Sequence, residues 1–161
     1  MDYSKCWLDY QPMDTIEKEW LTYFQSCEGE IVESAVSEYK LAMENMAGKV
    51  PQAVTKEEAG VVFSVDSSIK EGKDGYIITK EERQYQITGE SESGLLYGVF
   101  HFLRLIRTKQ TNCLPIHNTP EMPLRMMNHW DNMDGSIERG YSGESLFYKD
   151  YKILWNDRIV Q

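Results

Sequence analysis

A polar segment interrupted by glycines, residues 124–143, constrains this chain of 161 residues more than any other stretch. It opens with a short apolar run that predicts a strand from Leu124 to Asn128. Hydrogen-bonding side chains dominate the rest, and Gly135, Gly140 and Gly143 make a regular helix or strand there unfavourable. A strand that ends in a long polar loop is how a barrel enzyme presents a site at the carboxyl ends of its strands.

A solvated turn is the alternative interpretation for part of this segment. Asn132, Asp134 and Gly135 are typical turn residues, because they hydrogen-bond to nearby backbone or accept unusual backbone angles. A turn alone explains poorly why Trp130 lies within the polar run, since an indole is rarely left in solvent without a partner. Both interpretations remain open at this point.

Charge and hydropathy exclude several classes of protein. The formal net charge is -9, with 17 basic and 26 acidic residues, whereas nucleic-acid binding requires clustered Lys and Arg. No apolar run approaches the ~20 residues of a membrane span. A signal peptide has a basic start and an apolar middle, and the first ten residues have neither. We therefore expect no nucleic-acid partner and no membrane partner. We expect a cytoplasmic protein, or a periplasmic or secreted one if a leader was removed.

The three cysteines, Cys6, Cys27 and Cys113, are odd in number and have no CxxC spacing. This pattern argues against a disulfide framework and against a zinc site. We expect all three to be buried small apolar side chains in a reducing compartment.

Residues 1–123 have the pattern of one α+β domain with a mixed sheet and helices packed on it. Apolar residues at helical spacing predict a helix over 30–47 that stops at Gly48. A second apolar helix follows a cap at Ser91 or Ser93. Residues 16–24 fit either strand or helix. Strands are expected at 6–10, 60–66, 76–79, 85–88 and 113–117, with the third and fourth forming a hairpin.

The second helix contains glycines and a histidine that invite functional interpretations. Gly89, Gly94 and Gly98 match neither a Walker loop nor GxGxxG, so we expect them to permit close packing of the helix on the sheet. His101, on an apolar helix, is expected to be a core or boundary histidine with a hydrogen-bond partner.

Residues 124–161 predict one β/α unit: the strand, the polar loop, and a helix over 148–161. The helix would carry Tyr151, Leu154, Trp155 and Ile159 on one face, and such a unit cannot bury its own surfaces. We therefore expect this polypeptide to be part of something larger. The apolar side chains of Leu146, Phe147, Leu154 and Trp155 should then be exposed or covered by a neighbouring copy.

The residues of the polar segment exclude a calcium loop and disfavour a catalytic triad and a metal site. A calcium loop with Gly135 as its obligatory glycine would place Trp130 and Tyr141 at ligand positions, which neither can serve. A triad of Ser136, His129 and Asp131 lacks the strand–turn–helix around its serine. Metal ligation by His129 with Asp131 and Asp134 has no second histidine nearby. No metal or cofactor is predicted.

Carbohydrate binding is the chemistry that remains. Trp130 offers a face on which a sugar ring stacks, and Asp131, Glu138 and Arg139 offer bidentate partners for hydroxyl groups. Arg139 also suits the carboxylate of an anionic sugar.

The segments LRMMNHWDNMDGSIERGYSG, GLLYGVFHFLRLIR and CWLDY closely resemble the microbial alpha-glucuronidases of glycoside hydrolase family 67. The resemblance spans the whole chain in order. It implies that residues 1–123 are an N-terminal accessory domain like that of beta-hexosaminidases. Residues 124–161 then resemble the first strand, loop and helix of a TIM-barrel catalytic domain. The implied reaction is removal of glucuronic acid or its 4-O-methyl ether from xylo-oligosaccharides in xylan degradation, with inversion.

The resemblance also implies roles for individual residues. Trp130 would be a wall of the glucuronic-acid pocket, Glu138 and Arg139 would line it, and Asn128, His129 and Asp131 would support it. Glu138 and Arg139 equally suit an ion pair that stiffens the loop. The catalytic acid and base would lie beyond Gln161, so no catalytic residue is expected in this chain.

A barrel takes ~250 residues, so we expect no glycosidase activity from this chain alone. The partner expected for the larger protein is a xylo-oligosaccharide that carries glucuronic acid, and a homodimer is left open. The alternative function is a non-catalytic carbohydrate-binding or interaction module.

Overall fold

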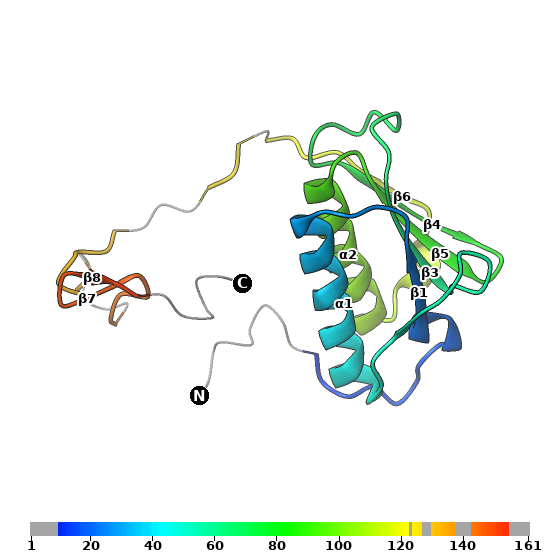
Figure 1. Cartoon of the computed structure of the whole chain (residues 1–161), viewed down its shortest axis with the longest axis horizontal. Helices are drawn as coiled ribbons and strands as arrows, with labels where there is room; N and C mark the ends of the chain where they lie inside the picture. Colours follow the sequence, from blue (N-terminus) through cyan, green and yellow to red (C-terminus); the bar gives the residue numbers. More distant parts are fainter. Residues whose placement is uncertain (1–9, 123, 127–129, 138–142, 155–161) are drawn as a thin grey trace. The chain divides into compact units, whose positions relative to one another are not determined.

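The computed structural model describes residues 10–122, 124–126, 130–137 and 143–154. Its contacts divide the chain into two compact units, Met1–Pro123 and Leu124–Gln161. The first contains a six-stranded sheet and two long helices (Figure 1). The second contains a two-stranded hairpin.

The sheet has the strand order β2-β1-β3-β5-β4-β6. Its strands are β1 (Thr22–Gln25), β2 (Gln52–Ala53), β3 (Val61–Val65), β4 (Tyr76–Glu81), β5 (Gln84–Gly89) and β6 (Ile116–Asn118). The pairs β2–β1, β1–β3 and β3–β5 are parallel, whereas β5–β4 and β4–β6 are antiparallel. The sheet is therefore mixed, as the sequence predicted.

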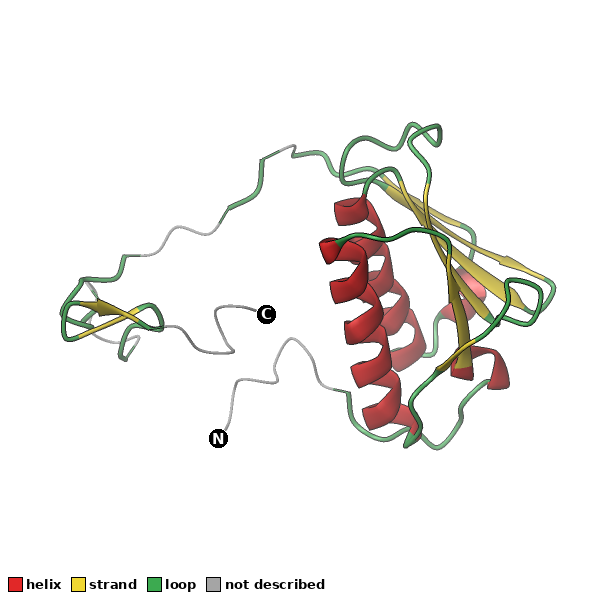
Figure 2. Ribbon diagram, viewed as in Figure 1, coloured by secondary structure: helices red, strands yellow, loops and turns green. Residues whose placement is uncertain are grey.

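Two helices, α1 (Glu30–Ala47) and α2 (Glu92–Arg107), lie side by side on one face of the sheet (Figures 1 and 2). Helix α1 ends as predicted, with Gly48 in the left-handed conformation and its N–H donating to the Glu44 carbonyl. Ser91 caps α2, because its Oγ accepts from the N–H of Gly94 at 3.2 Å. No helix of the described residues is long and apolar enough to cross a membrane.

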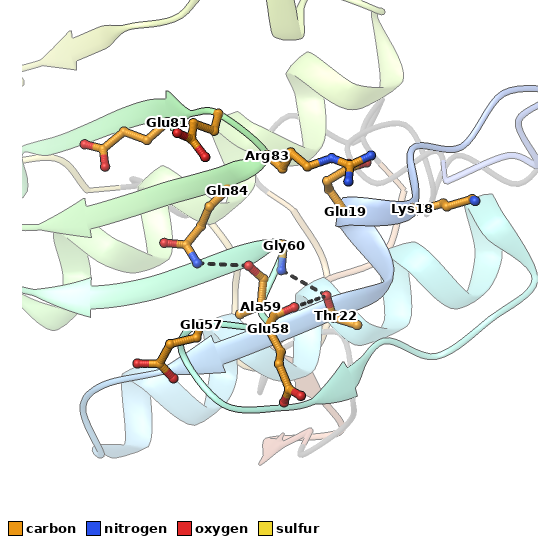
Figure 3. A pocket seen from close by; sticks show the side chains of 11 residues that line it. Lys18, Glu19, Thr22, Glu57, Glu58, Ala59, Gly60, Glu81, Arg83 and Gln84 are labelled. Atoms are coloured by element: carbon orange, nitrogen blue, oxygen red, sulfur yellow. Dashed lines mark hydrogen bonds and ion pairs between the residues drawn. The ribbon is translucent and has the colours of Figure 1, made fainter.

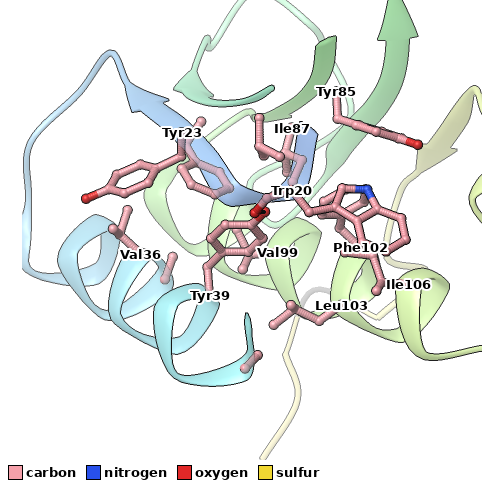
Figure 4. Close-up of a cluster of buried hydrophobic side chains, with 14 of the residues drawn as sticks. Trp20, Tyr23, Val36, Tyr39, Tyr85, Ile87, Val99, Phe102, Leu103 and Ile106 are labelled. Atoms are coloured by element: carbon pink, nitrogen blue, oxygen red, sulfur yellow. Dashed lines mark hydrogen bonds between the residues drawn. The ribbon is translucent and has the colours of Figure 1, made fainter. Parts of the chain in front are cut away.

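The core lies between the helices and the sheet (Figure 4). Tyr39 of α1 is fully buried, and its ring meets that of Phe63 edge-on with centroids 5.2 Å apart. Its hydroxyl donates to the Trp20 carbonyl at 2.7 Å, so the buried oxygen is not left unsatisfied. Strand β5 alternates, since it buries Tyr85 and Ile87 while its other side chains are partly exposed, whereas β3 buries Val61, Val62 and Phe63 in succession.

The glycines of α2 permit close packing, as predicted. A Cβ on Gly98 would lie 2.8 Å from Ile87 Cγ2, and one on Gly94 would lie 2.3 Å from the Gly75 carbonyl oxygen. Since real Cβ contacts are longer, these positions let the helix approach the sheet more closely than any other residue would allow.

Four predictions for the first unit need correction or completion. Residues 16–24 adopt both predicted states in turn, a 3-10 helix η1 (Lys18–Leu21) and then β1. Strand β2 was not predicted, since its two residues are exposed and carry no apolar pattern. The strand predicted at 113–117 is displaced: Thr111–Cys113 form the 3-10 helix η2, and pairing begins after Pro115, which has no N–H to donate. The strand predicted at 6–10 lies outside the described residues except for Tyr10, which is in no regular element.

The second unit departs from the predicted β/α unit. Residues 124–126 form no strand, and Leu124 and Met126 are 71% and 76% exposed. Where a helix over 148–161 was expected, β7 (Tyr148–Lys149) and β8 (Lys152–Ile153) pair as an antiparallel hairpin. Asp150 and Tyr151 both have positive φ, which matches the two-residue turn of a tight hairpin and ends any helix. Residues 155–161 lie outside the described residues.

Candidate functional site

A closed turn from Asp131 to Ile137 forms the centre of the predicted sugar-facing segment. Asp131 and Ile137 make an antiparallel bridge, and the N–H of Asn132 donates to the Ser136 carbonyl at 2.8 Å. The N–H of Gly135 donates to the Asn132 carbonyl at 3.0 Å, and Gly135 has a φ of 97°, which favours glycine. The chain therefore reverses over these residues with backbone hydrogen bonds across the turn.

Side chains inside the turn bond to one another. Asp134 Oδ1 accepts from the N–H of Ser136 at 2.8 Å and from its hydroxyl at 2.7 Å, and Asn132 Nδ2 donates to the same hydroxyl at 2.9 Å. The hydrogen bonds from the Ser136 side chain and backbone lower the pKa of Asp134. The turn interpretation of Asn132, Asp134 and Gly135 is thus confirmed. Ser136, the serine of the rejected triad, donates its proton to Asp134.

Ser145 ties this turn to the hairpin. It is the only buried residue in the described part of the second unit, at 6% exposure. Its hydroxyl donates to Asp131 Oδ2 at 2.5 Å and accepts from the N–H groups of Phe147 and Tyr148 at 3.0 and 2.9 Å. Ser145 was not predicted as a site residue. A serine that accepts from the amides two and three residues later is a common local turn, but its partner 14 positions earlier follows no sequence pattern.

Of the six predicted substrate-binding residues, the structure describes two adjacent ones. Trp130 immediately precedes the bridge and is 47% exposed, so the indole presents surface to solvent in this unit. Asp131 is half-buried and directs Oδ2 at Ser145. Asn128, His129, Glu138 and Arg139 lie outside the described residues, and their predicted roles remain predictions.

The hollows near the turn have mixed linings. One of about 470 Å³ lies between the turn and the hairpin, and its charged side chains are Asp134, Glu144, Asp150 and Lys149. Another of about 300 Å³ is lined by Asp131, Phe147, Tyr148 and Ile153. The first hollow has three carboxylates and one ammonium group among its described lining residues, so its charge disfavours an anionic sugar.

A larger hollow, of about 800 Å³, opens in the first unit beside η1 and the β4–β5 turn (Figure 3). Its polar groups are largely bonded to one another: Gln84 Nε2 donates to the Ala59 carbonyl at 2.9 Å, and Gly60 N donates to Thr22 Oγ1 at 2.9 Å. Its lining contains the carboxylates of Glu19, Glu57, Glu58, Glu81 and Glu82 but only two cations, Lys18 and Arg83. This balance disfavours glucuronate, and the hollow has the character of a packed surface groove.

His101 has the role predicted for it. Its Nδ1 lies 2.8 Å from the hydroxyl of Tyr76, and the two rings meet edge-on. Burial, and then the positive charge of Arg104, lower the pKa of His101, which favours the neutral imidazole. The histidine is therefore a boundary residue with a partner.

The cysteine prediction is wrong for one residue. Cys113 is exposed at the end of η2, and Cys27 is half-buried, with burial raising the pKa of its thiol. Cys113 lies in a short 3-10 turn that buries none of its residues, so its side chain has no core to enter. Cys6 lies outside the described residues. No group of three or more His, Cys, Asp or Glu side chains among the described residues is arranged to hold a metal ion.

An exposed indole beside a turn rich in carboxylates and amides offers a face and polar groups that suit a sugar ring. The chain matches the family model of the glycosyl hydrolase family 67 N-terminus over residues 6–102 and that of the family's middle domain over residues 104–161. It belongs to glycosyl hydrolase family 67, as the sequence resemblance predicted.

Curated relatives carry the name of one activity. The chain is 29% identical to a probable alpha-glucuronidase A of Aspergillus terreus, over 92% of this chain and 20% of that protein. It is 43% identical to a probable alpha-glucuronidase A of Aspergillus fumigatus, over 48% of this chain and 9% of that protein. The chain thus spans about a fifth of the length of the first relative. A solved GH138 enzyme targeting pectin rhamnogalacturonan II matches 65% of this chain and 16% of that chain, with 15% identity and a TM-score of 0.49.

Proposed function

We propose that this chain is the N-terminal part of an alpha-glucuronidase. The full-length protein would remove α-1,2-linked glucuronic acid, or its 4-O-methyl ether, from xylo-oligosaccharides with inversion. Membership of family 67, with relatives named alpha-glucuronidase, is the observation that carries this proposal. Residues 1–123 would act as an accessory domain and residues 124–161 as the start of the barrel. The compartment stays as predicted from the sequence, cytoplasmic or else exported after loss of a leader.

Within this chain, the proposed contribution to the site is a wall of the sugar pocket. Trp130 is exposed enough for a ring to stack on it, and the turn that follows is closed by hydrogen bonds of its own, which support the indole. Glu138 and Arg139 would supply hydrogen bonds and a positive charge for the sugar carboxylate. The catalytic acid and base would lie in the remainder of the protein.

A comparison of Trp130→Ala with Met133→Ala in a full-length family 67 protein containing this sequence tests the proposal. Both remove an exposed side chain from the same turn, since Met133 is 56% exposed, but only Trp130 is assigned to the sugar. With an aldouronic acid as substrate, we expect Trp130→Ala to lower kcat/KM by roughly tenfold to a hundredfold, as loss of a stacking contact does. Met133→Ala should remain within about threefold of wild type.

Two results would contradict the proposal. Absence of glucuronic acid release by the full-length protein would favour the non-catalytic carbohydrate-binding module. Release by the 161-residue chain alone would show that the catalytic carboxylates lie within it. The anomeric form of the first product, followed by NMR, separates inversion from retention.

A further inference from the structure

The hydroxyl group of Ser145 uses its full hydrogen-bonding capacity inside a unit that has almost no apolar core. A serine hydroxyl has one donor and two acceptor positions, and here Asp131 takes the donor while the amides of Phe147 and Tyr148 fill both acceptors. The backbone N–H of Ser145 donates to the Gly135 carbonyl at 2.9 Å. One residue therefore joins the first residue of the turn, the middle of the turn and the start of the hairpin.

Apolar packing supports this unit only weakly, because none of its described large apolar side chains is fully buried. Tyr151 is 72% exposed, Ile153 58% and Leu146 39%, while Ile137, Phe147 and Leu154 are half-buried. The turn and the hairpin are joined by a polar network centred on the buried Ser145. Removing its hydroxyl group takes a partner from three groups at once.

The geometry points to Ser145 as a positioning residue, which fixes through Asp131 the backbone from which Trp130 projects toward the sugar. Asp131 follows Trp130 directly, its backbone pairs with Ile137 and its side chain is held by Ser145, so loss of the Ser145 contact loosens the backbone that carries the indole. The sugar in this inference comes from the proposed function, whereas the contacts of Ser145 do not depend on it. It assigns to Asp131 a supporting role in which one carboxylate oxygen faces the protein.

A nucleophilic role for Ser145 does not fit the same contacts. Its side chain is buried, and its proton points to a carboxylate oxygen and not to an imidazole. The hydroxyl group is thus fully used in hydrogen bonds within this unit.

Amide hydrogen exchange in the 161-residue chain tests the geometry without any sugar. We expect Ser145→Ala to accelerate exchange at the Phe147 and Tyr148 amides by roughly tenfold or more, because both lose their acceptor. Ser136→Ala is the matched control, since Ser136 also donates to a carboxylate of the same turn but is exposed. It should leave those two amides within about twofold of wild type. Unchanged exchange in Ser145→Ala would overturn the inference.

Asp131→Asn keeps the test decisive if Ser145→Ala prevents folding of this unit. The amide retains an oxygen that accepts from Ser145, so the network is weakened and not removed. We expect the exchange rates of the Phe147 and Tyr148 amides to lie between those of wild type and Ser145→Ala. If Ser145→Ala is unfolded, the rates in Asp131→Asn should still exceed those of wild type. Exchange equal to wild type would contradict a role for Asp131 in the network.

A double-mutant cycle in the full-length protein tests the link to the sugar. Ser145→Ala should raise KM for an aldouronic acid by roughly tenfold, with kcat within about threefold, because binding geometry and not chemistry is altered. In the Trp130→Ala background the same change should raise KM by less than about twofold, since the indole it positions is absent. An equal rise in both backgrounds would show that Ser145 does not act through Trp130. If the wild-type protein had no glucuronidase activity, the proposed function and the link between Ser145 and the sugar would both be refuted. The exchange experiment would still show whether Ser145 holds the turn to the hairpin.

Discussion

At the residue scale, the carboxylate of Glu71 joins the loop before β4 to the edge strand β6. Glu71 Oε1 lies 3.0 Å from His117 Nδ1, and Oε2 accepts from the hydroxyl of Thr119 at 2.6 Å. The hydrogen bond from Thr119, and then that from His117, lower the pKa of Glu71. The contact therefore makes the stability of this edge depend on pH.

We expect Glu71→Gln to destabilise the first unit near neutral pH but not in acid. The pKa of Glu71 is lower in the folded chain than its ordinary value of 4.5, so its stabilisation is present above that value. The stabilisation is lost as the pH falls through the lower, folded pKa. Urea unfolding of wild type and variant between about pH 7 and pH 3 measures the difference.

Glu57→Gln provides the control for this experiment, because Glu57 is exposed and belongs to the same unit. It removes the same charge and should give a much smaller difference in urea midpoint across the range. A difference for Glu71→Gln that grows toward acid pH would have the wrong sign and would refute the assignment.

At the element scale, Gly98 sets the distance between α2 and the sheet. We expect Gly98→Ala to destabilise the first unit by about 1–3 kcal/mol, because its methyl group would press on Ile87 and Tyr76. Ser93→Ala also introduces alanine into α2, at a half-buried position of its first turn, but adds no carbon, and it should change the free energy of unfolding by less than about 0.5 kcal/mol. Chemical unfolding measures both. Equal stability of Gly98→Ala and wild type would show that the helix approaches the sheet less closely.

The β7–β8 hairpin makes a second prediction at this scale. Tyr151 has a φ of 63°, a conformation that glycine adopts without strain, and its side chain is 72% exposed. Tyr151→Gly should therefore stabilise the hairpin by up to about 1 kcal/mol, whereas it would destabilise a helix by a similar amount. The NMR shifts of Lys149 and Lys152 should become more strand-like. A loss of those shifts would favour the helix that the sequence suggested.

Burial of the apolar face decides which elements could be predicted from the sequence. Helix α1 was predicted at its observed bounds because Val32, Tyr39 and Met43 are all buried on one face. Similar apolar spacing after Tyr148 predicted a helix, which is wrong for residues 148–154. Tyr151 and Ile153 are exposed there, and the positive φ angles of Asp150 and Tyr151 form the turn of a hairpin. In the candidate site, residue types identified the turn, but Ser145 was missed because its contact to Asp131 joins distant positions.

At the scale of the whole molecule, the apolar core belongs to the first unit. Every member of the buried cluster lies between Trp20 and Ile106, and the half-buried residues packed on it extend only from Tyr10 to Ile116. The two family matches meet near residue 103, inside α2, whereas the contacts divide the chain after Pro123. Because Leu105 and Ile106 belong to the core, α2 acts as one element of the first unit.

We expect a chain shortened to residues 1–123 to unfold in one cooperative transition with the same urea midpoint as the first unit of the whole chain. The reason is that no described residue after Pro123 belongs to the buried cluster. Circular dichroism of α1 and α2 follows the transition in both chains. A midpoint lowered by more than about 0.5 M in the shortened chain would contradict this independence.

The parallel pairing of β1, β3 and β5 has a consequence for synthesis on the ribosome. Tyr23 pairs with Val61, which in turn pairs with Tyr85, so each central strand waits for a partner made much later. Until residues near Gly89 have emerged, one side of β3 has free backbone groups that can recruit another nascent chain. A pause in translation before that point would therefore favour aggregation, and one after it would not.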